Sequence, residues 1–299
     1  MEKSKQIIKM KKINFEDIKI YSDLPKKILN SSNEDIKYKT KQEVLREFNA
    51  EKWSLILNEI ASDKKINLHE IDKKMEAFDV LSPIFYKDDF YLASGKEVFE
   101  MHLDVFDKAI CKYINENTAL VELGAGYGSK ILNLSNKKKF HNVQLFAAEY
   151  TENGCNAIKH LSARMNKEIQ VGYCDLKKHV IKDISIPKNS VIFTSYALHY
   201  VQKLPDSFID FILSFEPKIV INFEPCFESH DDSSYGKLCK RYIELNDYNI
   251  DMVTTLESAF KKGLINMKVD KNVIGGNPFL PISIIEWNST KRTREKIEK

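Results

Sequence analysis

Paired cysteines and clustered metal ligands are missing from this 299-residue sequence. Its five cysteines are odd in number and scattered, with no C-x-x-C pair and no histidine nearby at a metal-ligand spacing. This pattern argues against a disulfide framework and against a bound metal. We therefore interpret the cysteines as reduced thiols in the core of a cytoplasmic protein.

Long apolar runs and a surplus of positive charge are also missing. No stretch of about 18 consecutive apolar residues occurs, and the Lys-rich N-terminal segment has no apolar signal-peptide core. The 46 Lys and Arg residues nearly balance the 43 Asp and Glu residues, which leaves a formal charge of +3. We therefore expect neither a membrane nor a nucleic acid as partner. The 43% hydrophobic content is sufficient for a substantial core.

The first third of the chain, residues 1–95, is predicted to be an N-terminal arm followed by a helical cap. Its beginning has the composition of a Lys-rich surface arm, with a short strand near 13–21. Apolar residues then recur at helical spacing over 41–81. The aromatic segment from Tyr86 to Tyr91 either lines a ligand pocket or belongs to the helical core.

Residues 96–299 follow a different pattern, in which short apolar or β-branched runs alternate with helical segments. This alternation is typical of an α/β, doubly wound, mostly parallel sheet. We predict a seven-stranded sheet whose last two strands form an antiparallel edge hairpin, with an insert at about 228–262. The predicted strands lie at residues 119–124, 143–150, 169–176, 190–197, 218–225, 266–273 and 282–287.

Glycine is scarce, with 10 in the whole chain, yet three of them fall within five positions of the segment VELGAGYGSKILNL. Gly124, Gly126 and Gly128 follow a predicted strand and precede an apolar-periodic helix. Ligands of open α/β sheets bind at this end of the strands, where bare backbone allows close approach and a helix N-terminus offers free N–H groups. The loop therefore favours a bound cofactor over a simple turn.

The spacing of this loop distinguishes between cofactors. A dinucleotide fingerprint, G-x-G-x-x-G, needs a glycine at position 129, which is Ser129. The pattern present is E-x-G-x-G-x-G, beginning at Glu122, and with this motif the sequence resembles the class I S-adenosylmethionine-dependent methyltransferases. The resemblance is strongest over residues 119–200 and fades toward the N-terminus.

The resemblance implies S-adenosyl-L-methionine as cofactor and assigns three carboxylates at the ends of strands. Glu149 lies 23 residues beyond Gly126, where an acidic side chain accepts hydrogen bonds from ribose hydroxyls. Asp175 matches the position beside the adenine amino group, and Glu122 the position near the methionine amino end. Each carboxylate alone has the alternative of capping the following helix. The implied cofactor-binding residues are Glu122, Gly124, Ala125, Gly126, Gly128, Glu149, Tyr150, Asp175, Leu176 and Ser195.

The methyl acceptor is expected beside the end of the fourth predicted strand, in the segment SYALHYV. Methyl transfer is an in-line displacement that mainly needs alignment and exclusion of water, with a base only where the acceptor starts protonated. His199 is the candidate base, with Tyr196 and Glu224 as further catalytic candidates. The alternative is that His199 packs against or caps the following helix.

Polar side chains near the fifth strand and in the insert are predicted to bind the acceptor. Carboxylates such as Glu224 and Glu228 suit a cationic or amine-bearing acceptor, although surface solubility explains them as well. The polar helix of the insert either faces the acceptor or is an exposed, salt-bridged surface helix. The predicted acceptor-binding residues are Tyr200, Asn222, Glu228, Tyr242, Asn246 and Asn249.

We predict a cytoplasmic S-adenosylmethionine-dependent methyltransferase that acts on a nitrogen or oxygen of a small molecule or peptide side chain. No N-P-P-Y-type tetrapeptide follows the fourth strand, which argues against methylation of adenine amino groups in nucleic acid. One alternative is a non-catalytic, cofactor-binding regulatory or scaffold protein, because fold alone does not confer function. An NAD-dependent oxidoreductase is disfavoured by Ser129.

Overall fold

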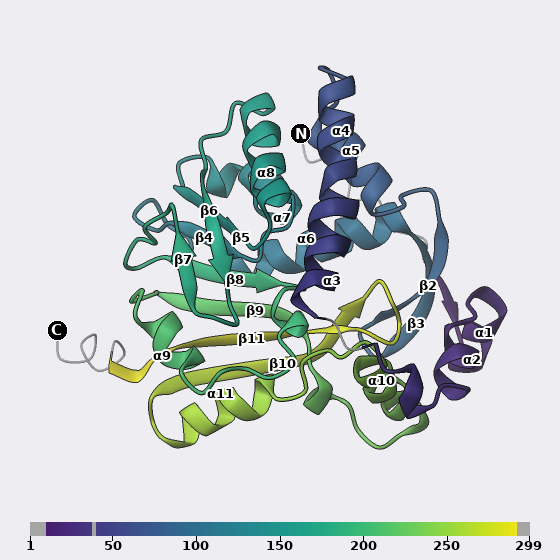
Figure 1. The fold of residues 1–299 in the computed structure, drawn as a ribbon. Helices are drawn as coiled ribbons and strands as arrows, with labels where there is room; N and C mark the ends of the chain where they lie inside the picture. The colour runs from purple at the N-terminus through teal and green to yellow at the C-terminus, as the bar shows by residue number, and fades with distance from the viewer. Residues whose placement is uncertain (1–9, 38–39, 292–299) are drawn as a thin grey trace, which may run out of the picture.

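A computed structural model describes residues 10–37 and 40–291, so the ends of the predicted arm and of the C-terminal domain lie outside the described residues. The described part of the chain forms one 11-stranded sheet in the order β1-β3-β2-β10-β11-β9-β8-β4-β5-β6-β7 (Figure 1). The α/β class predicted from the sequence is confirmed, but the sheet is mixed and not mostly parallel, because antiparallel strands flank its parallel centre on both sides. The predicted number of seven strands is wrong, because strands also form in the N-terminal third and after β6.

The centre of the sheet is parallel. Its strands are almost entirely buried, as expected for apolar runs that are covered on both faces. Because all five run in the same direction, their carboxyl ends meet at one edge of the sheet, where ligands of such folds bind. The five strands, which pair in parallel, are β4 (Leu120–Leu123), β5 (Leu145–Glu149), β6 (Gln170–Asp175), β8 (Val191–Ser195) and β9 (Ile219–Pro225).

Alternate residues of these strands enter two separate hydrophobic cores. Leu120 belongs to the core under one face of the sheet and its neighbour Val121 to the core under the other. The first core is covered by α4 (Ser54–Ser62), α5 (Leu68–Met75), α6 (Gly95–Ile110), α7 (Ser129–Ser135) and α8 (Glu152–Arg164). The second is covered by α9 (Phe208–Leu213) and α11 (Met252–Lys261).

Antiparallel strands extend the sheet on both sides. On one side, β11 (Ile282–Ser289) pairs with β9, and β10 (Ile265–Gly275) pairs with β11. The antiparallel pairing of the last two strands is thus as predicted. Their position at an edge is not, because β2 (Leu81–Tyr86) pairs with β10. The remaining strands are β3 (Asp89–Ser94), β1 (Lys11–Ile13) and, at the opposite edge, β7 (Val180–Lys182).

The hairpin of β2 and β3 adds strands to a region that was predicted to be an arm followed by a helical cap. Lys87 and Asp88 connect the two strands with φ values of 48° and 66°, as in a two-residue type I′ turn. Tyr86 and Tyr91 therefore lie on strands and not in a helical core. The predicted short strand near 13–21 forms earlier, at Lys11–Ile13, and helices follow it.

The helical segments of the N-terminal region pack in two places. The π-helix η3 (Arg46–Trp53) and α4 dock onto α8, whereas α2 (Leu24–Leu29), next to α1 (Ile18–Tyr21), packs against α10 (Ser234–Leu245). Helix α3 (Lys41–Leu45) leads into η3, α5 follows α4, and short 3₁₀ turns form at Phe15–Asp17 and Asn33–Asp35. The Arg164 guanidinium at the end of α8 donates to the carbonyl oxygens of Ile60 and Ile66 at 2.6 and 2.7 Å. These bonds satisfy one carbonyl group at the end of α4 and one in the segment that follows it, and so fix the cap to the sheet domain.

The predicted insert forms two helices between β9 and β10. A 3₁₀ turn, η6 (Phe227–Ser229), leads into α10 (Ser234–Leu245), and α11 follows. The Arg241 guanidinium on α10 donates to the carbonyl oxygen of Ser32 at 2.5 Å and to Asn33 Oδ1 at 3.0 Å. The insert therefore packs against the N-terminal arm (Figure 1).

Candidate active site

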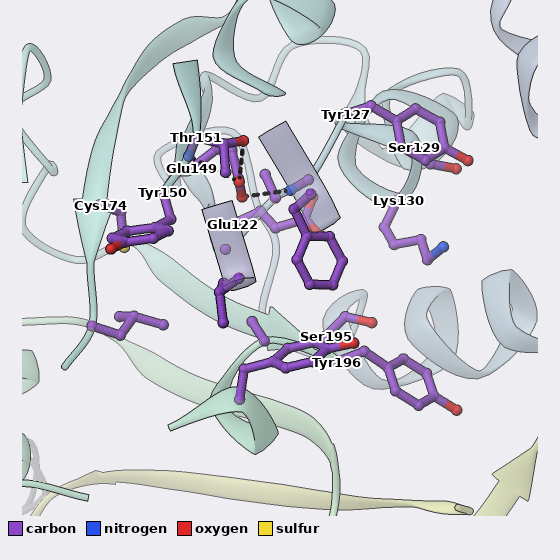
Figure 2. A pocket seen from close by; sticks show the side chains of 18 of the residues that line it. Glu122, Tyr127, Ser129, Lys130, Glu149, Tyr150, Thr151, Cys174, Ser195 and Tyr196 are labelled. Atoms are coloured by element: carbon purple, nitrogen blue, oxygen red, sulfur yellow. Dashed lines mark hydrogen bonds between the residues drawn. The ribbon is translucent and has the colours of Figure 1, made fainter. Parts of the chain in front are cut away.

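A cavity of about 720 Å³ lies at the carboxyl ends of the parallel strands, within the usual size range of ligand pockets. The ends of β4, β5, β6 and β8 form its floor, and side chains of η3, α6 and the β10–β11 loop form its walls. Tyr150 and Cys174 lie at one end of it, across from Lys130 (Figure 2). The cavity is therefore in the place where an open α/β sheet binds its ligand.

The glycine loop between β4 and α7 gives the cavity its bare surface. Gly124, Gly126 and Gly128 have φ values of +75°, +58° and +84°, which L-residues with side chains rarely adopt. A Cβ atom on Gly124 would lie 2.4 Å from Ala197 Cβ. Gly124 and Gly126, with Ala125 between them, line the cavity, whereas Gly128 forms the N-cap of α7 outside the cavity wall.

Glu149, at the end of β5, is held against the glycine loop. Its Oε2 accepts the Gly126 N–H at 2.9 Å, and its Oε1 accepts the Thr151 hydroxyl at 2.8 Å (Figure 2). Burial raises the pKa of Glu149, and the hydrogen bonds from Thr151 and Gly126 oppose that shift. These bonds fix the carboxylate at the cavity surface.

Glu122, on β4, is a second acidic group of the cavity floor. It is almost completely buried, and its Oε2 accepts the Ile131 N–H at 3.1 Å. Burial raises the pKa of Glu122 to about 8, although the positive charge of Lys130 lowers it. The ionised form is thus destabilised until a cation comes close to it.

Asp175, at the end of β6, lines the same end of the cavity as Tyr150 and Leu176. One of its carboxylate oxygens, Oδ1, accepts the Lys178 N–H at 3.0 Å, so Asp175 also caps the turn that follows β6. Asp175 therefore caps this turn and lines the cavity at the same time.

The end of β8 contributes Ser195 and Tyr196. Ser195 Oγ is buried and has no hydrogen-bond partner within the described part of the chain. Tyr196 has a φ of 50°, an uncommon conformation for a bulky residue that is frequent at functional sites. Its hydroxyl lies 3.3 Å from His102 Nε2, on α6. Both rings line the cavity.

His102 was not predicted to belong to the site. Its Nδ1 lies 3.0 Å from the carbonyl oxygen of Val98, one turn earlier in α6. The helix begins with a capping box in which Ser94 and Glu97 bond each other's backbone N–H groups, and this start sets the face on which His102 lies. A histidine among the apolar residues of an amphipathic helix is the signal that marks it in the sequence.

Lys130 and Glu76 form an ion pair at the same end of the cavity. Lys130 Nζ lies 3.0 Å from Glu76 Oε1 and 5.7 Å from the centre of the Phe99 ring. The ammonium group lowers the pKa of Glu76, and together with burial it lowers the pKa of His102 to about 4. The His102 imidazole is therefore neutral near neutral pH.

The N-terminal cap supplies part of the cavity wall through Trp53 and Phe48, whereas the segment from Tyr86 to Tyr91, a candidate from the sequence, does not line the cavity. Trp53 packs against Gly126 and Tyr127, and its Nε1 is a buried donor with no acceptor among the residues that the structure describes. The Phe48 ring meets the Tyr200 ring edge-on, with centroids 5.1 Å apart. Tyr200 thus lines the cavity, and its contact with an acceptor stays a prediction.

Glu224 and His199 lie outside the cavity lining, which differs from the catalytic roles predicted for them. Glu224 is fully buried, and its Oε1 accepts the N–H groups of Ala197 and Leu198 at 3.0 and 3.1 Å. It therefore stabilises the 3₁₀ turn η5 (Leu198–Tyr200). The His199 ring packs against Tyr200, with centroids 3.9 Å apart, and is 2% exposed.

Most of the other predicted acceptor-binding residues also make contacts within the fold. Asn222 bridges Thr194 and Trp287, and Glu228 accepts the Thr254 N–H at 2.9 Å. Neither Asn222 nor Glu228 lines the cavity, and Glu224 does not line it either. A cationic acceptor can therefore no longer be inferred from the carboxylates of Glu224 and Glu228.

The polar residues of the insert have structural partners as well. Asn246 donates to the Tyr242 carbonyl oxygen at 2.8 Å, at the end of α10. Asn249 is buried, donates to the Val201 carbonyl oxygen at 2.7 Å, and accepts the Met252 N–H at the start of α11. Tyr242 packs beside Tyr248. None of the three lines the cavity.

The described ranges contain neither a cluster of metal ligands nor a helix suited to cross a membrane. No three histidine, cysteine, aspartate or glutamate side chains between residues 10 and 291, outside 38–39, gather as metal ligands. Over the same ranges, no helix combines the length and the apolar character needed to cross a membrane.

Comparison with known proteins identifies the fold. No family model matches the chain, and no curated protein matches its sequence significantly. Magnesium protoporphyrin IX methyltransferase (ChlM) from Synechocystis PCC 6803, solved with bound SAH, matches with a TM-score of 0.51 and 11% identity, covering 84% of this chain and 100% of that chain. PigF, solved with SAH, matches with a TM-score of 0.50 and 14% identity, covering 92% of this chain and 72% of that chain. The chain has the class I S-adenosylmethionine-dependent methyltransferase fold, as the glycine motif predicted.

Proposed function

We propose that this chain, which has the class I methyltransferase fold, is an S-adenosylmethionine-dependent methyltransferase. The observation that carries the proposal is the hydrogen bond of 2.9 Å between Gly126 N–H and Glu149 Oε2. It joins the bare loop after β4 to an acidic side chain at the end of β5, inside the cavity. A glycine loop and a strand-end carboxylate in this relation are suited to a ribose with its attached groups.

The cavity has the polar groups that this cofactor needs. Glu149 offers its carboxylate oxygens to ribose hydroxyls, and Asp175 lies where an adenine amino group can donate to it. Glu122 offers a carboxylate to the cationic methionine end. The buried Trp53 Nε1 and Ser195 Oγ have no partners in the described ranges and are available to a ligand.

The bound cofactor would supply a methyl group on a positively charged sulfur, which is electrophilic without further activation. The chain's own contribution is to align an acceptor with that methyl group and to keep water away. Ser195 and Tyr196 stand between the cofactor-binding strand ends and the wall made by α6. Trp53 and Phe48 close the cavity from the side of the cap.

The acceptor is proposed to be a small molecule or a peptide side chain that presents an oxygen or nitrogen. The cavity walls beyond the cofactor-binding residues are mainly apolar and aromatic, with a few polar groups, as in sites for compact organic ligands. The near balance of basic and acidic residues, with a formal charge of +3, gives no support to a phosphate-tracking surface. The protein is proposed to work in the cytoplasm.

Calorimetric titration with S-adenosylmethionine and S-adenosylhomocysteine tests the proposal. Micromolar binding to the natural sequence is expected, with loss of about 100-fold or more in Glu149→Ala, because the ribose contact is lost and the Gly126 N–H loses its acceptor. Glu152→Ala, one turn away at the exposed start of α8, is the matched control and should bind normally. No binding of either compound, together with stabilisation by NADH, would contradict the proposal.

Transfer is tested separately with methyl-labelled cofactor against small molecules, peptides and RNA. Label in small molecules or peptides supports the proposed acceptor class. Label found in RNA alone would reject that class while keeping the methyltransferase assignment. Binding of cofactor with no transfer to any acceptor would favour a non-catalytic protein.

A further inference from the structure

The acceptor end of the cavity contains a hydrogen-bonded pair, His102 and Tyr196. Apolar side chains surround it, including Val98 and Phe99 from α6 and Leu280 from the β10–β11 loop. Neither side chain is among those assigned to the cofactor in the proposed function. Their hydrogen bond is thus available to the acceptor.

The tautomer of His102 follows from its contacts. The Val98 carbonyl oxygen, 3.0 Å from Nδ1, can only accept a hydrogen bond, so Nδ1 carries a proton. In the neutral ring Nε2 is then an acceptor, and the Tyr196 hydroxyl, 3.3 Å away, donates to it. This direction leaves the lone pairs of Tyr196 Oη available to a donor in the cavity.

The fixed charges beside the pair compensate each other. Lys130 from α7 and Glu76 from the end of α5 form their ion pair at 3.0 Å, and these are the ionised groups that face His102. Tyr196 faces it from the end of β8. A charged acceptor would therefore enter an apolar chamber without an unpaired counter-ion, at a substantial desolvation cost. A neutral acceptor avoids that cost.

We propose that Tyr196 and His102 form a proton relay that selects a neutral hydroxyl group as the methyl acceptor. This inference rests on the proposed function and deepens it. Tyr196 is the group that touches the acceptor, and His102 acts through Tyr196. The pair therefore defines both the substrate class, a neutral alcohol or phenol on a small apolar body, and the route by which its proton leaves.

The transfer step balances in atoms and charge. The acceptor oxygen forms a bond to the methyl carbon as the carbon–sulfur bond breaks, with its electron pair remaining on sulfur. The hydroxyl proton of the acceptor passes to Tyr196 Oη while the proton of Tyr196 passes to His102 Nε2. The products are a methyl ether, a neutral thioether and an imidazolium ion, which returns its proton to water when the cavity opens.

A weak base is adequate for this step with oxygen. Burial and the Lys130 ammonium lower the pKa of His102 to about 4, and Glu76 opposes the shift. Such an imidazole leaves a free hydroxyl protonated, but the hydroxyl proton becomes strongly acidic as the carbon–oxygen bond forms. A methylated amine stays basic and would retain its proton. The relay consequently assists an oxygen acceptor more than an amine.

Four ligands with one naphthalene ring test the selection. The SAH-loaded protein is titrated with 2-naphthol, 2-naphthylamine, 2-naphthoate and 2-naphthylmethylammonium. We expect 2-naphthol to bind about 10-fold or more tightly than the anion and the cation. Tyr196→Phe should weaken 2-naphthol binding by about 10-fold and leave SAH binding unchanged. Equal or tighter binding of a charged ligand, or no binding of 2-naphthol, overturns the inference.

The relay itself has a spectroscopic signature. In protein with ¹⁵N-labelled histidine, His102 should show the Nδ1-protonated tautomer, and 2-naphthol should shift its Nε2 resonance. His102→Gln keeps an acceptor for Tyr196 but cannot take up a proton, so 2-naphthol should bind within about 3-fold while its methylation falls by about 100-fold. A signal for the Nε2-protonated tautomer, or full methylation by His102→Gln, would disprove the relay.

Controls separate this inference from loss of folding and from failure of the proposed function. His230→Gln changes another buried histidine, 6% exposed and outside the cavity lining, and should leave both ligand selection and methylation unchanged. Tyr235→Phe is the matching control for Tyr196→Phe, because it removes a tyrosine hydroxyl that donates to the Pro278 carbonyl oxygen at 2.6 Å. It should also leave ligand selection and methylation unchanged. Absence of SAH binding refutes the cofactor assignment, whereas SAH binding without selection among the naphthyl ligands refutes the relay alone.

Discussion

Ser129 Oγ donates a hydrogen bond of 2.7 Å to Asp72 Oδ1, and so joins the first turn of α7 to α5 across 57 positions of the sequence. Asp72 is fully buried and also accepts from the Tyr127 hydroxyl and from Asn133 Nδ2. Ser129 occupies the position of the third glycine in a dinucleotide motif. In this protein the residue helps to hold the N-terminal cap in place through its bond to Asp72.

Asp72→Ala should lower the free energy of unfolding by about 2–3 kcal/mol, because two buried donors and one half-buried donor lose their acceptor. Urea denaturation measures this loss. Asp79→Ala is the control: Asp79 pairs with Lys73 at 3.1 Å and is 80% exposed, so a change within about 0.5 kcal/mol is expected. Equal losses in the two variants would mean that Asp72 does not anchor the cap.

Gly124→Ala should abolish detectable cofactor binding. The added Cβ would lie 2.4 Å from Ala197 Cβ and would require a left-handed backbone from alanine, so the loop must move. Gly263→Ala isolates the backbone effect, because Gly263 has a φ of +69° but no atom within 4 Å of the added Cβ. It should cost about 1 kcal/mol of stability and leave SAH binding intact. Calorimetry on both variants decides the matter, and normal SAH binding by Gly124→Ala would count against the loop as the cofactor site.

Cofactor binding should release a proton near neutral pH. Burial raises the pKa of Glu122 to about 8, so most of this carboxyl is protonated before a cation pairs with its ionised form. The binding enthalpy should accordingly depend on the ionisation enthalpy of the buffer, and affinity should increase as pH rises toward 8. In Glu122→Gln the proton release should vanish, whereas Glu152→Gln should retain it.

The raised pKa of Glu122 also affects the stability of the folded protein. Affinity for the cofactor should increase as pH rises, whereas stability should decrease. Because the folded pKa of Glu122 lies above its unfolded value of about 4.3, folding favours the protonated carboxyl. The stability that protonated Glu122 contributes is fully present below pH about 4.3, which is its pKa in the unfolded chain. It is lost as pH rises through about 8, which is its pKa in the folded protein. Ligand-free protein should therefore unfold at lower urea concentration as pH rises toward 8, and Glu122→Gln should weaken this trend.

Glu224→Gln distinguishes a structural from a catalytic carboxylate. The buried carboxylate accepts N–H groups from Ala197 and Leu198, so the neutral amide should cost about 1–3 kcal/mol of stability. Affinity for SAH and for 2-naphthol should stay within about 3-fold, because Glu224 does not line the cavity. Unchanged stability combined with lost methyl transfer would restore the catalytic role.

The features that the sequence predicted correctly are local ones. The strand, glycine turn and helix around Gly126 lie within a few residues of each other, and Glu149 follows at the end of the next strand. Local propensity and topology are enough to bring such residues to one edge of a parallel sheet. The antiparallel pairing of β10 and β11 was predictable for the same reason.

The residues that were missed come from distant segments. Asp72 on α5 and His102 on α6 reach the cavity or its supporting loop only through tertiary packing of these helices, which no short pattern specifies. A polar residue on the apolar face of a helix was their only signal. The position of Glu224 outside the cavity could not be predicted for a related reason, because a carboxylate at a strand end can serve a ligand or the backbone N–H groups of the next turn.

The apolar cluster beside α10 bears on how the chain can be divided. Ile13, Ile18 and Leu92 from the first 95 residues pack there against Leu238 and Phe279, which belong to the sheet domain. A protein truncated to begin at Lys96 would present these two side chains to water, together with the backbone edge of β10 that β2 now covers. Such a surface invites pairing between copies, so the shortened chain is expected to aggregate.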